Sequence, residues 1–498
     1  MDKKAQSILQ TRREFIRQAA CAALGTAALS STIRDLRFMN AAVAQSNISD
    51  YKALVCVFLQ GGNDSNNLII PTLQAEYDSY AAIRTPVLAI PQPNILNLDN
   101  EGTFDYTPLN NDGHTYGLHP CCSELRTLFG EGKLALLFNT GTLLFPLTRA
   151  QYLSGALKKP PQLFSHADQV MQWQTSVPDQ PALTGWGGRC ADLLAAVQPG
   201  APISLSVTLS GANTFEVGNQ VSQYSVSTSG AISLSGVTNG TPRFAALTNI
   251  LGQAYPNMQA AAYANVAAHS INTATLLNGA ISNTIEAPTG QWTWNTPWPT
   301  TITVPTSGVK FTSGLTPQLR MIARLIDAGH RSAAQGGFGM KRQVFFCQVG
   351  GYDLHTNQTP GPGQTTVGSH ANLLAEISQS LLAFQRAMEQ LGISNNVTVF
   401  TASDFNRTFP SNGQGTDHGW GSHHLVLGGA VKGRRTYGVW PSLTVNGPDD
   451  TGTGRWIPST AIDQYFATLA TWFGVDPGNL ATVFPNLYRF STPNLGFI

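Results

Sequence analysis

Four short, mainly apolar runs constrain the fold of this chain more than any other feature. They cover residues 53–59, 134–138, 344–349 and 397–401. Mainly apolar runs of this length are typical of strands that are covered on both faces, as in a parallel sheet. The runs therefore predict a central, mostly parallel sheet between layers of helices.

Helical patterns lie between and after these runs. Apolar residues at steps of three and four between Leu374 and Leu391 predict a helix that ends at Gly392, because glycine often terminates helices. The same spacing predicts helices over residues 319–326 and 462–473. Strands that alternate with helices indicate an α/β fold. With 42% hydrophobic and 11% charged residues, the chain can bury a large core.

Residues 200–240 depart from this alternation. They are rich in Ser, Thr, Gly, Val and Asn and carry almost no charge. We interpret them as the start of a β-rich insertion, at about residues 200–315, within a single domain over residues 45–498.

The first 44 residues have the pattern of a twin-arginine signal peptide. Arg12 and Arg13 precede a modestly apolar stretch, and the small residues at positions 42–44 favour cleavage after Ala44. The stretch is short and is broken by Gly25, so a permanent membrane anchor is not expected. We therefore expect a periplasmic or secreted protein that meets the twin-arginine translocase during export.

The charge balance argues against two classes of partner. The formal charge is +1, and removal of residues 1–44, with seven basic and three acidic side chains, leaves −3. Neither nucleic acid nor an anionic membrane surface is an expected partner of such a chain.

Acidic side chains and a histidine follow three of the predicted strands. Asp64 comes five residues after the first run, Asp353 and His355 follow the third, and Asp404 follows the fourth. Open α/β sheets bind their ligands beyond the carboxyl ends of the strands. We therefore expect these side chains to share one edge of the sheet.

A further cluster at residues 416–424 contains Asp417, His418, His423 and His424. Carboxylates and imidazoles from several loops are the ligands that one or two divalent cations require. Histidine favours Zn, Mn or Fe over Ca. The predicted metal ligands are therefore Asp64, Asp353, His355, Asp404, Asp417, His418 and one or both of His423 and His424.

Each of these residues also has a purely structural interpretation. Asp64 could cap a turn, and Asp353 with His355 could form a hydrogen-bonded pair in a turn. His424 precedes an apolar run, so it could be a core histidine, which makes His423 the preferred ligand of the two.

Residues 57–64, 350–358 and 416–429 resemble the family filed as domain of unknown function 1501, and residues 455–475 and 484–487 also fit it. The resemblance covers nearly the whole chain after residue 44. That family is similar in turn to the alkaline phosphatase and sulfatase superfamily. The resemblance implies an alkaline phosphatase-like core and hydrolysis of phosphate or sulfate esters with cations held at strand ends.

The resemblance also suggests individual roles. It makes Asp64 the metal aspartate of the first strand, and Asp353 with His355 the pair that binds one ion. Asp404 matches an Asp-His pair of the superfamily, but Phe405 follows it here, so His418 is the candidate for that histidine.

Two further residues are suggested as catalytic groups. Ser165 precedes a helical pattern, as the nucleophile of the superfamily does, and could also be a simple helix N-cap. Arg407 is a candidate anion clamp, with a surface salt bridge as the alternative.

These features leave two hypotheses. The first is an exported metal-dependent hydrolase of phosphate or sulfate esters, acting on a small molecule or a polysaccharide. The second is a non-catalytic exported scaffold or glycan-binding protein that retains a structural metal site.

Overall fold

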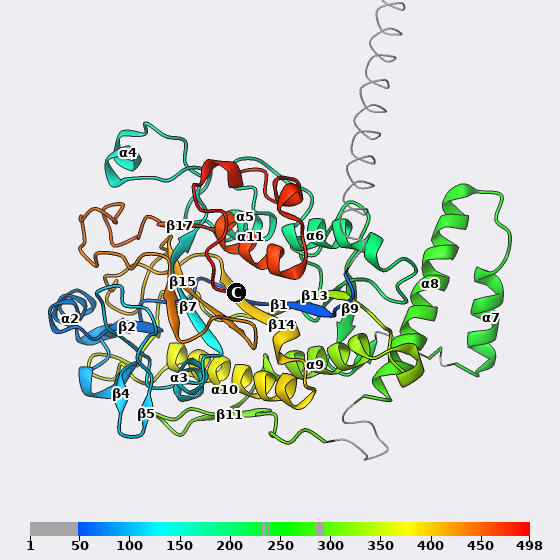
Figure 1. Ribbon diagram of the computed structural model, residues 1–498, viewed down its shortest axis with the longest axis horizontal. Coiled ribbons are helices and arrows are strands. Elements are labelled where there is room, and N and C mark those ends of the chain that lie inside the picture. The colour runs from blue at the N-terminus through cyan, green and yellow to red at the C-terminus, as the bar shows by residue number, and fades with distance from the viewer. Residues whose placement is uncertain (1–47, 232–235, 238, 285–292) are drawn as a thin grey trace, which may run out of the picture.

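A large mixed sheet forms the centre of the computed structural model (Figure 1), which describes residues 48–231, 236–237, 239–284 and 293–498. Within these residues ten strands join one sheet. Nine of them follow the spatial order β10 (Gly230–Ala231), β9 (Tyr224–Ser227), β8 (Ser206–Thr208), β13 (Arg342–Val349), β1 (Lys52–Leu59), β14 (Val397–Ser403), β15 (Ser422–Gly428), β7 (Leu134–Gly141) and β16 (Arg435–Tyr437). The remaining strand, β17 (Thr460–Ala461), pairs with β7.

Most neighbouring strands of this sheet are parallel. β1 lies between β13 and β14 and is parallel to both, and β8 and β9 continue the same direction. β15 is antiparallel to β14 and to β7. At one edge β10 is antiparallel to β9. The carboxyl ends of β1, β13 and β14 therefore meet at one edge of the sheet.

Helices cover both faces of the sheet, as Figure 1 shows. One face is covered by α3 (Ser123–Gly130), α9 (Thr316–His330) and α10 (Ser369–Gln390). The other is covered by α5 (His166–Thr175), α6 (Trp186–Leu194) and α11 (Ile462–Phe473). All residues of β1 after Lys52 are buried, which explains the mainly apolar composition of the central strands.

The structure confirms the predicted α/β class. All four apolar runs are strands of the central sheet, and the three predicted helices are α10, α9 and α11. Residues 206–231 supply β8, β9 and β10 at one edge of this sheet. β15 was not predicted as a strand, because its first residues, Ser422 to His424, are polar although they are buried.

Smaller elements surround this core. Short sheets are formed by β2 (Ile69–Pro71), β6 (Tyr116–Leu118) and β3 (Leu96–Asn97), by β4 (Asn100–Glu101) and β5 (Phe104–Asp105), and by β11 (Thr301–Thr303) and β12 (Lys310–Thr312). The outer helices are α2 (Gln74–Leu88), α4 (Arg149–Ser154), α7 (Pro242–Leu251), α8 (Met258–Ile281) and α12 (Leu480–Val483). α7 and α8 form a hairpin that projects from the body (Figure 1). Among the described helices, none has the length and apolarity needed to cross a membrane.

Candidate metal centre

The loops that follow β1, β13 and β14 approach each other closely at the carboxyl edge of the sheet. Gly61, two residues after the end of β1, has a φ of 114°, and a Cβ atom there would lie 2.5 Å from the backbone nitrogen of Asp353. Its backbone N–H donates to Asp404 Oδ1 at 2.9 Å. Because only glycine tolerates both the conformation and the contact, Gly61 brings the three loops together.

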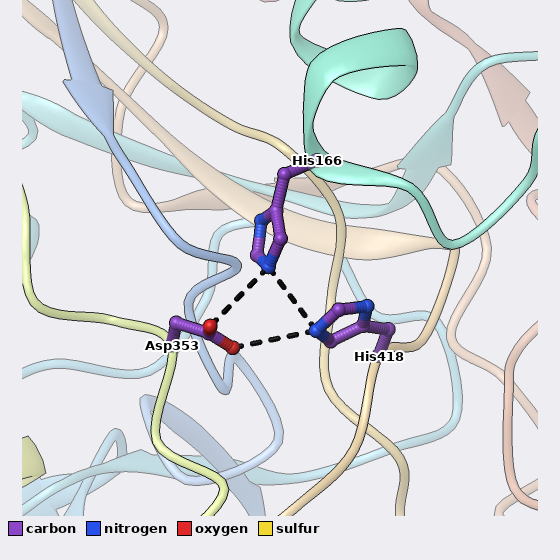
Figure 2. Close-up of side chains that lie close together, drawn as sticks. All are labelled: His166, Asp353 and His418. Carbon is purple, nitrogen blue, oxygen red and sulfur yellow. Dashed lines mark hydrogen bonds and ion pairs between the residues drawn. The ribbon is translucent and has the colours of Figure 1, made fainter.

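Three side chains from different elements converge above this edge (Figure 2). His166 is the first residue of α5, Asp353 follows β13, and His418 precedes β15. His166 Nε2 lies 3.1 Å from His418 Nε2 and 3.4 Å from Asp353 Oδ2, and His418 Nε2 lies 3.3 Å from Asp353 Oδ1. These three residues can each offer one ligand atom to a single metal ion.

His355 extends this group with a third imidazole. Its Nε2 atom lies 2.9 Å from His418 Nε2 and 3.2 Å from Asp353 Oδ1. The side chains of His355 and Asp353 are 43% and 46% exposed, so solvent reaches one side of the group. We call His166, Asp353, His355 and His418 the centre.

Each imidazole of the centre has an oxygen acceptor at its other nitrogen. His166 Nδ1 lies 2.7 Å from Asp404 Oδ2, and His355 Nδ1 lies 3.0 Å from Asp417 Oδ1. His418 Nδ1 lies 2.6 Å from the backbone carbonyl oxygen of Phe164. In each ring Nδ1 therefore donates its proton, which leaves the Nε2 lone pair directed at the centre. Metal-binding histidines are oriented in this way by acceptors behind them.

Without a cation, the lone pairs of the centre conflict. His418 Nε2 has one lone pair but two imidazole nitrogens within 3.1 Å, from His166 and His355. A proton on His166 can satisfy only one of these contacts, so a lone pair still faces another lone pair. A cation bound by His166, His418 and Asp353 would relieve this conflict, and this is the strongest indication of a metal site in the structure.

The pKa values of the rings follow their surroundings. The hydrogen bond to the Asp404 carboxylate raises the pKa of His166, although partial burial opposes it. Partial burial lowers the pKa of His418, and the charge of Arg407 adds to that effect. His166 therefore binds a proton more strongly than His418 does.

Arg407 holds the carboxylate of the centre in place. Its guanidinium is fully buried, donates to Asp353 Oδ1 at 2.8 Å and also contacts the backbone oxygens of Gly61 and Thr416. Burial alone would raise the pKa of Asp353, but the hydrogen bond and charge of Arg407 outweigh it, and the pKa lies below its usual range. The structure therefore places Arg407 behind Asp353, without an exposed face toward an anion.

The spacing of the ligand atoms suits a small divalent cation. The ligand atoms of His166, Asp353 and His418 lie 3.1 to 3.4 Å apart. A tetrahedral ion with metal–ligand bonds of about 2.0–2.1 Å holds its ligand atoms about 3.3 Å apart. Imidazoles combined with a carboxylate favour Zn, Mn or Fe, whereas Ca prefers sites made of oxygen ligands.

A pocket of about 910 Å³ opens beside the centre, between α5, the ends of β1 and β13 and the segment that follows β8. His166, Asp353 and Asp404 lie in its wall. Its volume is at the upper end of the range of about 300–1,000 Å³ found for small-molecule sites. A ligand in this pocket would contact the centre directly.

Asp64 lies apart from the centre. Its carboxylate forms a buried ion pair with Arg84 of α2 and accepts a hydrogen bond from Gln358 Nε2 at 2.5 Å. Burial alone would raise the pKa of Asp64, but Arg84, His370 and these hydrogen bonds outweigh it, so the pKa lies below its usual value. Asp64 is thus not among the predicted ligands that the structure brings together. These are Asp353, His355, Asp404, Asp417 and His418.

His423 and His424 lie in the core, on β15. His423 Nδ1 accepts from the backbone N–H of Asn139 at 3.1 Å, and its ring stacks on Trp440. His424 packs against Trp173. Burial lowers the pKa of each histidine to about 3, so both rings are neutral. The structure does not bring either of them to the centre.

Ser165 is the N-cap residue of α5. Its Oγ donates to Asp168 Oδ2 at 2.6 Å and accepts no hydrogen bond from the helix backbone. The next residue, His166, was not predicted as a metal ligand, because it does not follow a strand. Its position directly after the predicted helix start at Ser165 was the only available signal.

Comparison with known proteins identifies the family. The family described as "Protein of unknown function (DUF1501)" matches residues 51–482. The chain belongs to this family. No curated protein matches the sequence.

Two solved structures illustrate what the DUF1501 chain is similar to. The first is Ps i-CgsB in complex with k-i-k-neocarrahexaose, with 9% identity, 89% of this chain and 78% of that chain covered, and a TM-score of 0.32. The second is a Bacteroides thetaiotaomicron protein described under the metabolism of multiple glycosaminoglycans, with 11% identity, 88% and 74% coverage, and a TM-score of 0.32. Both TM-scores are low.

The predicted twin-arginine signal over residues 1–44 lies outside the described residues of this DUF1501 protein. Export, cleavage after Ala44 and the periplasmic or secreted location therefore stay predictions. The resemblance to the DUF1501 family, in contrast, is confirmed.

Proposed function

We propose that this DUF1501 protein is a metal-dependent hydrolase of phosphate or sulfate esters. The observation that carries the proposal is the convergence of three Nε2 lone pairs and the Asp353 carboxylate, each ring being oriented from behind by an oxygen acceptor. One divalent cation, Zn, Mn or Fe, fits the ligand atoms of His166, Asp353 and His418. When bound, it would polarise an ester oxygen and lower the pKa of a water molecule.

The position of α5 supports an anionic ester as the substrate. The first N–H groups of a helix have no partner within the helix and attract negative charge. α5 begins at His166, and Ala167 lines the pocket next to His166 and Asp353. An ester group near the centre would therefore lie beside the positive end of this helix.

We propose that Ser165 is a helix-terminal residue and not the attacking group. Its hydroxyl donates to Asp168, and none of its described contacts reaches the centre. Water would then be the attacking group. Arg407 and Asp404 act through other residues, because they hold Asp353 and His166 respectively.

The test combines metal analysis with an activity screen. Protein purified without chelators is analysed for bound metals and then assayed against phosphate and sulfate monoesters and diesters. We expect His166→Ala and His418→Ala to lose bound metal and ester hydrolysis together. His330→Ala is the matched control, because His330 ends α9 and its ring lies near Tyr51, which precedes β1 at the opposite edge of the sheet.

Two results would contradict this proposal. If the His166 and His418 variants keep their metal, the centre is not a metal site. If the native protein binds metal but hydrolyses no ester, the second hypothesis, a scaffold or glycan-binding protein with a structural metal, replaces it. Ser165→Ala separates the two kinds of attack, since loss of hydrolysis with metal retained would make Ser165 the nucleophile.

A further inference from the structure

The pocket beside the centre has an unusual lining. Of its residues, seven carry neutral amides or hydroxyls: Gln60, Gln174, Ser210, Asn213, Thr214, Gln223 and Gln348. Neither lysine nor arginine is among the described residues of the lining, and its charged groups are the two carboxylates beside the centre, Asp353 and Asp404, with His166. The wall beyond the centre is therefore polar but uncharged.

Three glutamines of this wall have side-chain oxygens that already accept hydrogen bonds from the protein. Gln60 Oε1 accepts from Gln348 Nε2 at 2.5 Å, and Gln174 Oε1 accepts from the backbone N–H of Thr214 at 2.8 Å. Gln223 Oε1 accepts from the backbone N–H of Asn213 at 3.2 Å. Each oxygen is thus held by the protein, while none of the three NH2 groups has a partner among the described residues. These groups are free to donate to a ligand.

Apolar side chains also line this pocket. Helix α5 contributes Ala167, Val170 and Met171 to the lining, and the segment after β8 contributes Ala212 and Val217. A sugar ring presents hydroxyl and ring oxygens at its rim and C–H groups on its faces. Donors spaced among small apolar contacts suit that pattern, because polar groups set the orientation and apolar surface supplies contact area.

From this lining we infer that the pocket binds a neutral carbohydrate chain. The inference rests on the proposed function in one respect, because this carbohydrate is taken to carry the phosphate or sulfate group that is hydrolysed. A polyanionic chain fits poorly, because no lysine or arginine among the described residues of the lining can pair with its charges. The substrate class is thus a sparsely esterified glycan.

The test measures binding separately from hydrolysis. Metal-free protein is titrated calorimetrically with cellohexaose, xylohexaose, mannohexaose and chitohexaose, and with hexagalacturonate as the polyanionic probe. We expect at least one neutral hexasaccharide to bind, and hexagalacturonate to bind at least tenfold more weakly. Tighter binding of hexagalacturonate, or no binding of any neutral hexasaccharide, would overturn the inference.

A double variant tests the amides directly. Gln174→Glu with Gln223→Glu keeps the oxygen that each backbone N–H requires and replaces each NH2 donor with an acceptor. We expect saccharide binding to weaken tenfold or more while the folded protein keeps its melting temperature. Gln253→Glu, in the exposed turn between α7 and α8, is the matched control for the added charge. Unchanged saccharide binding in the double variant would refute the role of these glutamines.

The outcomes for binding and for hydrolysis are independent. If neutral hexasaccharides bind but no ester is hydrolysed, the pocket inference stands and the proposed function fails. If simple esters are hydrolysed but no neutral saccharide binds, the proposed function stands and the carbohydrate inference fails.

Discussion

Replacement of Asp404 by Asn tests the centre most sharply. Asp404 is 1% exposed; its Oδ1 accepts from the Gly61 N–H at 2.9 Å, and its Oδ2 lies 2.7 Å from His166 Nδ1. In Asp404→Asn the amide oxygen must stay on the Gly61 N–H, which turns the new NH2 group toward His166. His166 Nδ1 then has to accept, so its proton moves to Nε2. The Nε2 lone pair is no longer available to a metal.

The expected magnitude follows from the general effect of replacing a residue that hydrogen-bonds to a metal ligand. Such changes lower metal affinity about 10- to 100-fold, which is about 1.4–2.7 kcal/mol. Loss of the carboxylate also removes the interaction that raises the pKa of His166. We therefore expect the dissociation constant for Zn to rise at least tenfold at pH 7.5, as measured by competition with a chromophoric chelator.

Asp168→Asn is the matched control for this experiment. Asp168 lies in the first turn of α5 and accepts from Ser165 Oγ, so the change removes one carboxylate near the same helix end. We expect it to leave Zn affinity within about twofold and to cost about 0.5 kcal/mol of stability. Wild-type Zn affinity in Asp404→Asn, or equal losses in both variants, would refute the proposed role of Asp404.

Three further predictions follow from buried charges and from Arg455. Burial raises the pKa of Asp463 from 3.8 to about 7. The unfolded state therefore ionises first, and the free energy of unfolding falls between about pH 4 and pH 7. In urea, Asp463→Asn should unfold like the native protein at pH 4 but be up to about 4 kcal/mol more stable at pH 8. Equal stabilities at pH 8 would contradict that pKa. Arg455 Nε donates to the His418 carbonyl oxygen at 2.6 Å. Arg455→Lys should therefore weaken Zn binding by about 1 kcal/mol in the same chelator assay. Unchanged Zn binding would show that Arg455 does not position His418. Asp64→Asn breaks the buried ion pair with Arg84 and should lower the free energy of unfolding by about 3–5 kcal/mol. Its metal content, measured by mass spectrometry, should stay unchanged. Loss of metal at unchanged stability would make Asp64 a ligand.

The main architecture could be predicted from the sequence because burial acts on local composition. Strands β1, β13 and β14 are buried on both faces, so they show as apolar runs wherever they occur in the chain. The apolar spacing of α10 reports its buried side in the same way. Asp353, His355 and Asp404 could be grouped because the carboxyl ends of neighbouring parallel strands share one edge.

Which residue meets which depends instead on contacts between distant segments. Asp64 follows a strand as Asp404 does, but α2 places Arg84 against it, and the resulting ion pair occupies its carboxylate. His166 comes from the start of a helix, where local composition gives no sign that Asp404, more than two hundred residues later, will orient its ring.

The paired histidines of β15 show the same division. Their sequence context is compatible with a ligand or a core residue, since imidazole serves as either. Only the packing of Trp173 and Trp440 around them, from other parts of the chain, decides that His423 and His424 are buried and neutral. Sequence alone determined the central strands β1, β7, β13 and β14, the helices α9, α10 and α11, and the edge at which Asp353, His355 and Asp404 meet. Tertiary structure decided the ligands, because the charge and orientation of a side chain are set by the neighbours that fold against it.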